Sequence, residues 1–239
     1  MKLYEAKMKE LTFILDECIN FEGNNGRSGV RSLEEVFLAK RLCGDLSRKL
    51  RRTLFAINPN PTREQAFEIA QRPEIRQTVL LIASIARQYA QNHRDFDVGT
   101  ILIGLREVTI PGENPWVVRH SANTRESVYV FKYCGELRLD DQAKASNVRH
   151  VILLCIVGQP NLDHGSGKQS DTLTPCEICR YRFRLTMSNT GIMQLDTLIV
   201  TANHYDLEHP EFWTVETLHA FHGEDVYNVT IEVVAELRC

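Results

Sequence analysis

The spacing of apolar residues along the chain changes from a helical period to a strand-like one near Val98. Before that point, apolar residues recur every three or four positions among charged ones, which is typical of amphipathic helices. Ser32-Leu-Glu-Glu35 and Thr62-Arg-Glu-Gln65 are capping-box sequences, and Pro73 suits a first helical turn. The helices that we expect are residues 1–21, 32–57, 62–71 and 73–91.

Beyond Val98, β-rich runs alternate with helical segments. Residues 99–110 are expected to form a hairpin or one bent strand, and a further strand starts at Trp116, a core residue. Residues 148–157 are expected to form a buried strand whose run from Val151 to Val157 is uninterruptedly apolar, so we expect helices on both faces of the sheet. The remaining expectations are a helix from Cys134 to Ala145, a helix after Cys179 to about Met187, strand-forming residues at 192–202, a loop at 204–213 and a strand or tail at 227–237.

Composition narrows the class of protein. A chain of 239 residues that is 43% hydrophobic can bury a full core, so we expect one domain with an extension. The net charge of −3 argues against a general nucleic-acid binder. The sequence shows neither an apolar run of membrane-spanning length nor a signal peptide, so we expect a soluble, cytoplasmic protein without a membrane partner. In that compartment its seven cysteines would stay reduced.

Three of these cysteines have the spacing of a metal site. Cys134-Gly-Glu136 is followed by Thr174-Pro-Cys176-Glu-Ile-Cys179. A catalytic zinc ion has three protein ligands and keeps its fourth position open for water. We therefore predict one Zn²⁺ per chain, held by Cys134, Cys176 and Cys179. Glu136 is the expected catalytic residue, because zinc deaminases need a glutamate that moves protons without binding the metal.

Local geometry supports this prediction. Cys176 and Cys179 are three residues apart, which places both sulfur atoms on one face of a helical turn. The thiolates would lie near two helix N-termini, whose partial positive charge lowers the pKa of a thiol. Arg138 and Arg180 lie close enough in sequence to offset the remaining negative charge. A structural or degenerate site that binds zinc without turnover is the competing interpretation.

The cysteine motifs resemble those of the cytidine deaminase superfamily, most closely the free-nucleoside cytidine deaminases and blasticidin S deaminase. The resemblance spans about residues 76–225 and includes Phe96-Asp-Val-Gly99, Tyr129 and the segment Glu216–Asp225. It implies a three-layer α-β-α fold with a central mixed sheet in residues 76–239, preceded by a helical extension in residues 1–75. It also implies a small nucleoside-type substrate and a homo-oligomer, either a tetramer or a dimer.

The resemblance also suggests which residues bind the substrate. Asn123 falls where the family has a sugar-binding asparagine, and Phe221 where a phenylalanine helps to form a neighbouring subunit's base pocket. The family's ribose-binding carboxylate falls on Arg125, with Glu126 one place late. An arginine there could favour a phosphate or carboxylate on the substrate. We therefore expect a cytosine-type nucleoside, nucleotide or analogue other than plain cytidine, converted to the uracil-type product and ammonia.

Other departures and alternatives accompany this hypothesis. The family's alanine between cysteine and glutamate is Gly135, and its proline in the last motif is His219. Residues 160–172 form a loop longer than usual, which could be a lid or a tolerated insertion. A second function class is a nucleic-acid-editing deaminase that uses the basic stretch Lys40–Arg52 as a strand guide. A third is a non-catalytic zinc protein.

Overall fold

The computed structural model describes residues 33–90, 97–125, 132–159, 170 and 172–227. The helices are α2 (Leu33–Ile57), α3 (Arg63–Ala70), α4 (Pro73–Arg87), α5 (Gly135–Ala145), α6 (Glu177–Thr190) and α7 (Val215–His222). The strands are β1 (Gly99–Arg106), β2 (Trp116–Ala122), β3 (Thr124–Arg125), β4 (Lys132–Tyr133), β5 (Val148–Gly158), β6 (Leu198–Asn203) and β7 (Asp206–Thr214). Helices and strands alternate from β4 to β6, as the sequence predicts.

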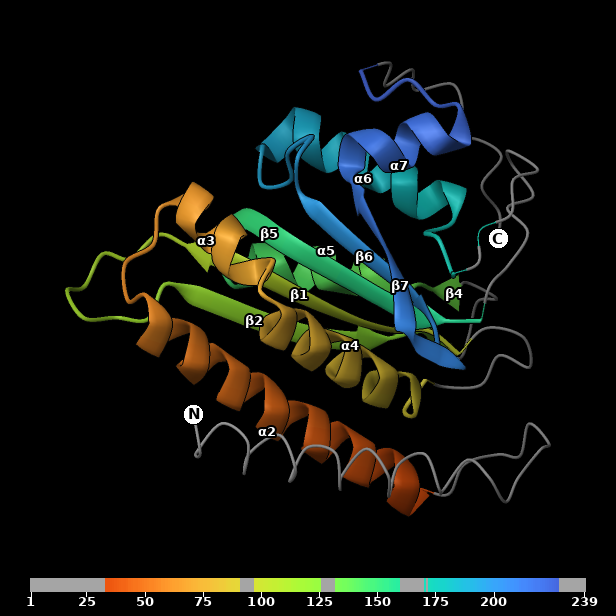
Figure 1. Cartoon of the computed structure of the whole chain (residues 1–239), viewed down its shortest axis with the longest axis horizontal. Helices are drawn as coiled ribbons and strands as arrows, with labels where there is room; N and C mark the ends of the chain where they lie inside the picture. Colours follow the sequence, from red (N-terminus) through yellow and green to blue (C-terminus); the bar gives the residue numbers. More distant parts are fainter. Residues whose placement is uncertain (1–32, 91–96, 126–131, 160–169, 171, 228–239) are drawn as a thin grey trace.

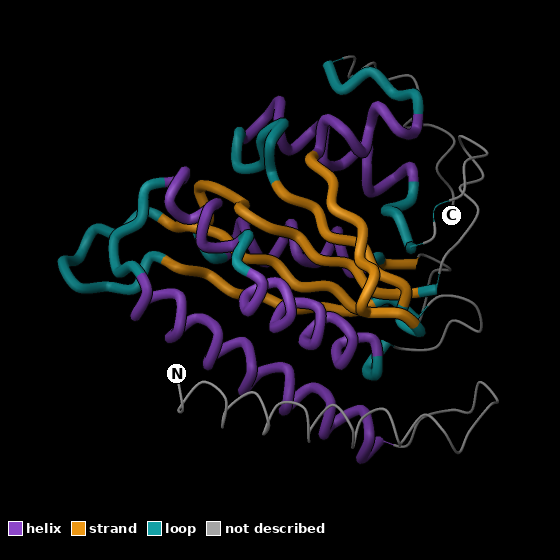
Figure 2. The backbone as a smooth tube through the Cα atoms, in the orientation of Figure 1, coloured by secondary structure: helices purple, strands orange, loops and turns teal. Residues whose placement is uncertain are grey.

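A five-stranded mixed sheet forms the middle of the molecule (Figures 1 and 2). Its strand order is β2-β1-β5-β6-β7, with β5 and β6 parallel and the other neighbours antiparallel. The two short strands β3 and β4 pair with each other beside it. Parallel strands need a crossover connection, and α6 lies in the one between β5 and β6.

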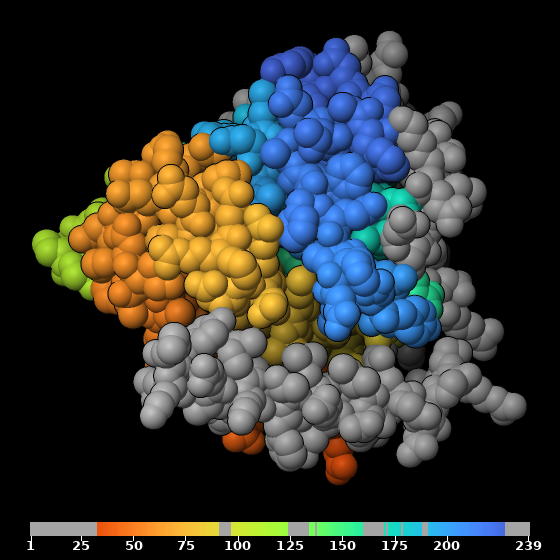
Figure 3. All heavy atoms as spheres, viewed as in Figure 1, coloured from red at the N-terminus to blue at the C-terminus, as the bar shows by residue number. Residues whose placement is uncertain are grey.

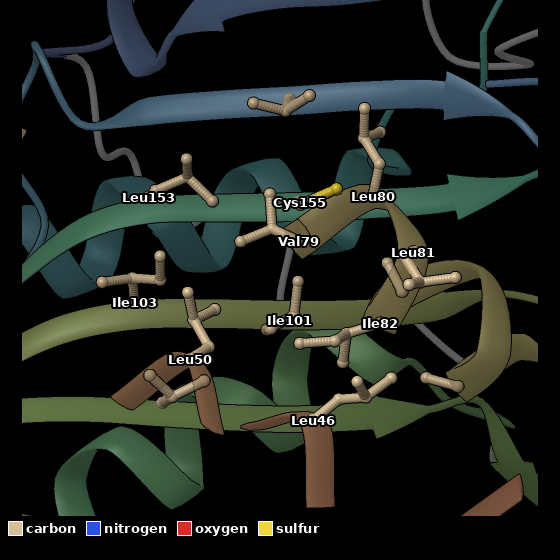
Figure 4. Packing of buried hydrophobic residues seen from close by; sticks show 14 of the residues in the cluster. Leu46, Leu50, Val79, Leu80, Leu81, Ile82, Ile101, Ile103, Leu153 and Cys155 are labelled. Atoms are coloured by element: carbon tan, nitrogen blue, oxygen red, sulfur yellow. The ribbon is translucent and has the colours of Figure 1, made fainter. Parts of the chain in front are cut away.

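Alternating side chains on the strands divide the core into two layers. Ile101 and Ile103 of β1 pack with Cys155 of β5 in the cluster that includes α2, α3 and α4, part of which Figure 4 shows. Leu102 and Leu154 belong to the cluster on the opposite face, which includes α5, α6 and α7. The sheet is thus covered on both faces. The predicted three-layer α-β-α architecture with a mixed sheet is confirmed.

The N-terminal helices share their core with the sheet. Thr62 caps α3 with both hydrogen bonds of the predicted capping box. Trp116 is fully buried, and its indole Nε1 donates to the backbone oxygen of Asn58 at 2.9 Å. Arg51 of α2 donates from Nε to the backbone oxygen of Trp116 at 2.7 Å. These bonds fasten α2 and the loop after it to the edge strand β2.

Two predictions about the strands need correction. The loop expected at residues 204–213 is wrong, because β7 pairs with β6 there, with Trp213 opposite Ile199. Pro210 and the exposed charged residues of this run obscured its strand character. An edge strand accommodates them, since within the described residues its outer side has no ladder partner. The β-rich run 99–110 also ends earlier than expected, at Arg106, and its hairpin partner is β2.

Several predictions lie outside the described residues. They include the helix at 1–21, the start of the capping box at Ser32, the possible lid at 160–169, and the strand or tail beyond residue 227. Among the helices that are described, none combines the length and the apolar character that a membrane span would require.

Arg76 of α4 stacks over Phe212 of β7, with 4.3 Å between the guanidinium carbon and the ring centroid. These two elements adjoin on the surface in Figure 3.

Candidate metal centre

The three predicted metal ligands lie together on the side of the sheet covered by α5 and α6. Cys134 is the residue immediately before α5, Cys176 is the residue immediately before α6, and Cys179 lies in the first turn of α6. Their sulfur atoms all lie within 4.8 Å of one another. The Cys176 and Cys179 sulfur atoms are 3.4 Å apart. Two helix N-termini therefore carry one cluster of three thiols.

The start of α5 is fixed against the edge of the sheet. The side-chain oxygen of Asn123 accepts a hydrogen bond from the Gly135 backbone N–H at 2.7 Å, and the Asn123 backbone N–H donates to Val98 at 3.1 Å. A β-carbon on Gly135 would lie 2.9 Å from the Thr100 hydroxyl. This close approach explains a glycine between Cys134 and Glu136.

The carboxyl group of Glu136 is almost entirely buried, with 6% of the residue exposed. Burial, and then the neighbouring Cys176, raise the pKa of Glu136 to about 8. A carboxyl group with a pKa near neutrality can both accept and donate a proton under physiological conditions. The structure therefore places a readily protonated carboxyl group beside the thiol of Cys176.

The thiols fit a zinc ion. Hydrogen bonds with Cys134 and Cys176, followed by burial, raise the pKa of Cys179, so the three sulfur atoms cannot all be thiolates together without a counter-charge and compete for the ionised form. A divalent cation would resolve this competition, because thiolate is the form that binds metal. Three sulfur donors suit zinc better than magnesium or calcium, which prefer oxygen. Cys179 is fully buried, whereas Cys134 and Cys176 are partly exposed.

A buried aspartate joins the two helices that carry the thiols. Asp140 of α5 accepts hydrogen bonds from Arg182 Nε at 2.8 Å and from Thr186 Oγ1 at 3.3 Å, both on α6. It also accepts one from Lys144 Nζ at 2.6 Å, one turn further along α5. Only 7% of Asp140 is exposed. This cluster links α5, which begins after Cys134, to α6, whose start carries Cys176 and Cys179.

The predicted substrate-binding residues are placed as follows. Asn123 lies directly beside the metal centre through its bond to α5. Arg125 is on β3, paired with Lys132 on β4, and Glu126 lies outside the described residues. Phe221 is on α7, where its ring packs against Trp213 at 5.1 Å between centroids. Of these residues, the described contacts connect Asn123 most directly to the thiols.

Sequence reasoning missed two interactions that shape the centre. The Asp140–Lys144 pair has a local signal, the i,i+4 spacing of opposite charges on a helix. The pairing of Arg180 with Glu224 joins residues that are 44 apart in sequence. It therefore has no local signal.

No protein-family model matches the chain, and no curated protein matches it. Solved structures do match. A cytidine deaminase from Burkholderia pseudomallei has 19% sequence identity and a TM-score of 0.42, covering 59% of this chain and 94% of that one. Cytidine deaminases from Mycobacterium leprae and Mycobacterium tuberculosis each have 17% identity and a TM-score of 0.38. They cover 59% of this chain, and 94% and 91% of theirs.

Proposed function

We propose that this protein is a zinc-dependent hydrolytic deaminase. Its substrate would be a cytosine-type nucleoside, nucleotide or nucleoside analogue, and its products the corresponding uracil-type compound and ammonia. The observation that carries the proposal is the juxtaposition of three thiols within 4.8 Å of one another with a buried carboxyl group two residues from the first. The C-x-E and P-C-x-x-C motifs at these positions support it.

Cys134, Cys176 and Cys179 would hold the metal. Zinc bound by three protein ligands supplies Lewis-acid activation of water near neutral pH. Glu136 would accept a proton from the attacking water at its carboxylate. It would then give that proton to the ring nitrogen, take a second proton from the hydroxyl group added to the reacting carbon, and pass it to the departing amino group. The carbon–nitrogen bond breaks as the new carbonyl forms, and the amino group leaves as ammonia. The raised pKa of Glu136 suits it to both roles.

Substrate recognition is proposed from the residues near this centre. Asn123 would position the sugar, because its bond to Gly135 fixes it at the start of α5. Arg125 would select an anionic group, such as a phosphate or carboxylate, with Glu126 beside it. Phe221 would contact the base from a neighbouring subunit of a homo-oligomer.

Ammonia release tests the proposal. The zinc-loaded protein would be incubated with cytidine, deoxycytidine, their phosphates, blasticidin S, and short single-stranded DNA and RNA. Glu136→Gln keeps the size of the side chain but removes its capacity to transfer protons, so it should abolish turnover while zinc stays bound. Cys43→Ser is a control for loss of a thiol outside the cluster, because Cys43 is a buried residue of α2 and donates to the backbone oxygen of Ile82.

The outcomes separate the three function classes. Turnover of a free nucleoside or nucleotide, lost in Glu136→Gln and kept in Cys43→Ser, supports the proposal. Turnover confined to the single strands indicates an editing deaminase. A protein with one zinc ion and no ammonia release from any compound contradicts the enzymatic proposal and indicates a non-catalytic zinc protein.

A further inference from the structure

A buried arginine adjoins the metal centre. Arg180 follows Cys179 directly, and its side chain is 1% exposed. Its Nη1 donates to the backbone oxygen of Pro175 at 2.7 Å. Pro175 immediately precedes Cys176, and Arg180 immediately follows Cys179. The guanidinium group of Arg180 therefore links the peptide after Cys179 to the peptide before Cys176.

The charge of Arg180 is balanced from a distant part of the chain. Its Nε and Nη2 donate to Oε1 of Glu224 at 2.9 and 2.7 Å. The second carboxylate oxygen of Glu224 lies 2.6 Å from Nδ1 of His219, a fully buried residue of α7. Arg180 therefore connects the start of α6 to the C-terminal end of α7.

The turn after α7 fixes the position of Glu224. Gly223 ends the helix in the left-handed conformation, with φ of 73°. The Glu224 backbone N–H donates to the backbone oxygen of His219 at 2.9 Å. Burial alone would raise the pKa of Glu224, but the bonds from His219 and Arg180 lower it to about 2. The carboxylate is therefore ionised and held in place from both sides.

We propose that Glu224 is a positioning residue for the metal ligands. Through Arg180 it holds the Pro175 carbonyl, and with it the peptide that carries Cys176, so that the Cys176 and Cys179 sulfur atoms face Cys134. Charge-assisted bonds between arginine and carboxylate fix geometry as well as contributing energy, and such outer contacts tune metal affinity. This inference rests on the metal site of the proposed function. It adds that α7 and the turn after it belong to the machinery that shapes this site.

Metal affinity tests the inference without reference to catalysis. Glu224→Ala removes the partner of Arg180, whereas Glu224→Gln keeps an oxygen acceptor of nearly the same shape and loses only the charge. Asp225→Asn is the matched control, since Asp225 is the neighbouring carboxylate and is exposed. Zinc affinity would be measured by competition with a chromophoric chelator on the full chain. The absorption spectrum with Co²⁺ in place of zinc would report the geometry of the sulfur ligands.

We expect Glu224→Ala to weaken zinc binding by about 10- to 100-fold and to alter the Co²⁺ spectrum. Glu224→Gln should recover part of the affinity, and Asp225→Asn should match the wild type. If Glu224→Ala does not fold, Glu224→Gln alone still decides, because a weakened affinity is expected for it as well. A folded Glu224 variant that is less stable but keeps the wild-type zinc affinity and the wild-type Co²⁺ spectrum would overturn the inference. Failure of the wild type to bind zinc would instead refute the proposed function.

Discussion

The link between the two thiol-bearing helices provides a quantitative prediction. Asp140→Asn removes the carboxylate charge, whose Oδ2 lies 2.8 Å from Arg182 Nε and 2.6 Å from Lys144 Nζ. Hydrogen bonds to charged groups contribute about 1.5–3 kcal/mol each. Arg182 and Lys144 are 40% and 37% exposed, so solvent screens both interactions. We therefore expect the variant to lower the free energy of unfolding by about 2 kcal/mol in total.

Thermal unfolding would measure this loss. For a chain of this length a loss of about 2 kcal/mol corresponds to a decrease in Tm of about 4–8 °C. The measurement would be made with zinc and with a chelator. Because Asp140 sets α5 against α6, the variant should also weaken zinc binding, and the decrease in Tm should be larger with zinc than with the chelator.

Asp141→Asn is the control for this prediction. Asp141 is 50% exposed and lies 3.7 Å from Arg182, so it has the same partner without the burial. Its replacement should change the free energy of unfolding by less than about 0.5 kcal/mol. Equal losses in the two variants would show that burial does not strengthen the Asp140 cluster, and the reasoning would fail.

Three further predictions concern packing and pH. Gly99→Ala would place a β-carbon 1.9 Å from a backbone oxygen of α4, so it should lower the free energy of unfolding in urea by about 3 kcal/mol or more. Gly44→Ala, whose β-carbon would have its nearest contact at 3.5 Å, should instead stabilise α2 by up to about 1 kcal/mol. Gly135→Ala should weaken zinc binding through its contact with Thr100, and the added change Thr100→Ala should restore most of the affinity; no recovery would contradict the steric explanation. Burial, and then a neighbouring arginine, lower the pKa of His120 to about 4, so below pH 6.5 the unfolded chain binds a proton that the folded chain does not. The free energy of unfolding should therefore fall between pH 6.5 and 4, by up to about 2 kcal/mol at pH 5, and Tm at pH 7 and 5 should differ less in His120→Asn.

Local signals in the sequence located several of the helices and strands. The capping box at Thr62 and the apolar run of β5 depend on neighbouring residues, and both appear as predicted. The helix expected from Cys134 begins at Gly135, whereas the helix expected after Cys179 begins earlier than predicted, at Glu177. β7 was missed because an edge strand need not be apolar, and its pairing with β6 comes from tertiary structure.

Two positions that differ from the resembled cytidine deaminase pattern make specific contacts in the structure. His219, where that pattern has a proline, pairs with Glu224 five residues further on, and Glu224 accepts hydrogen bonds from Arg180. Gly135, where that pattern has an alanine, lies beside Thr100. The contacts of Glu224 with Arg180 and of Gly135 with Thr100 cannot be identified from one sequence, because they depend on how α7 and β1 pack against the thiol-bearing helices.

If this site deaminates a cytosine-type substrate as proposed, water replaces the amino group of that substrate while Glu136 moves the protons. Mass spectrometry of the products formed in ¹⁸O-labelled water tests it most directly. We expect the zinc-loaded wild type to form a uracil-type product with one ¹⁸O atom, and Glu136→Gln to form none. Absence of labelled product from every cytosine compound, or equal labelling by Glu136→Gln, would contradict it.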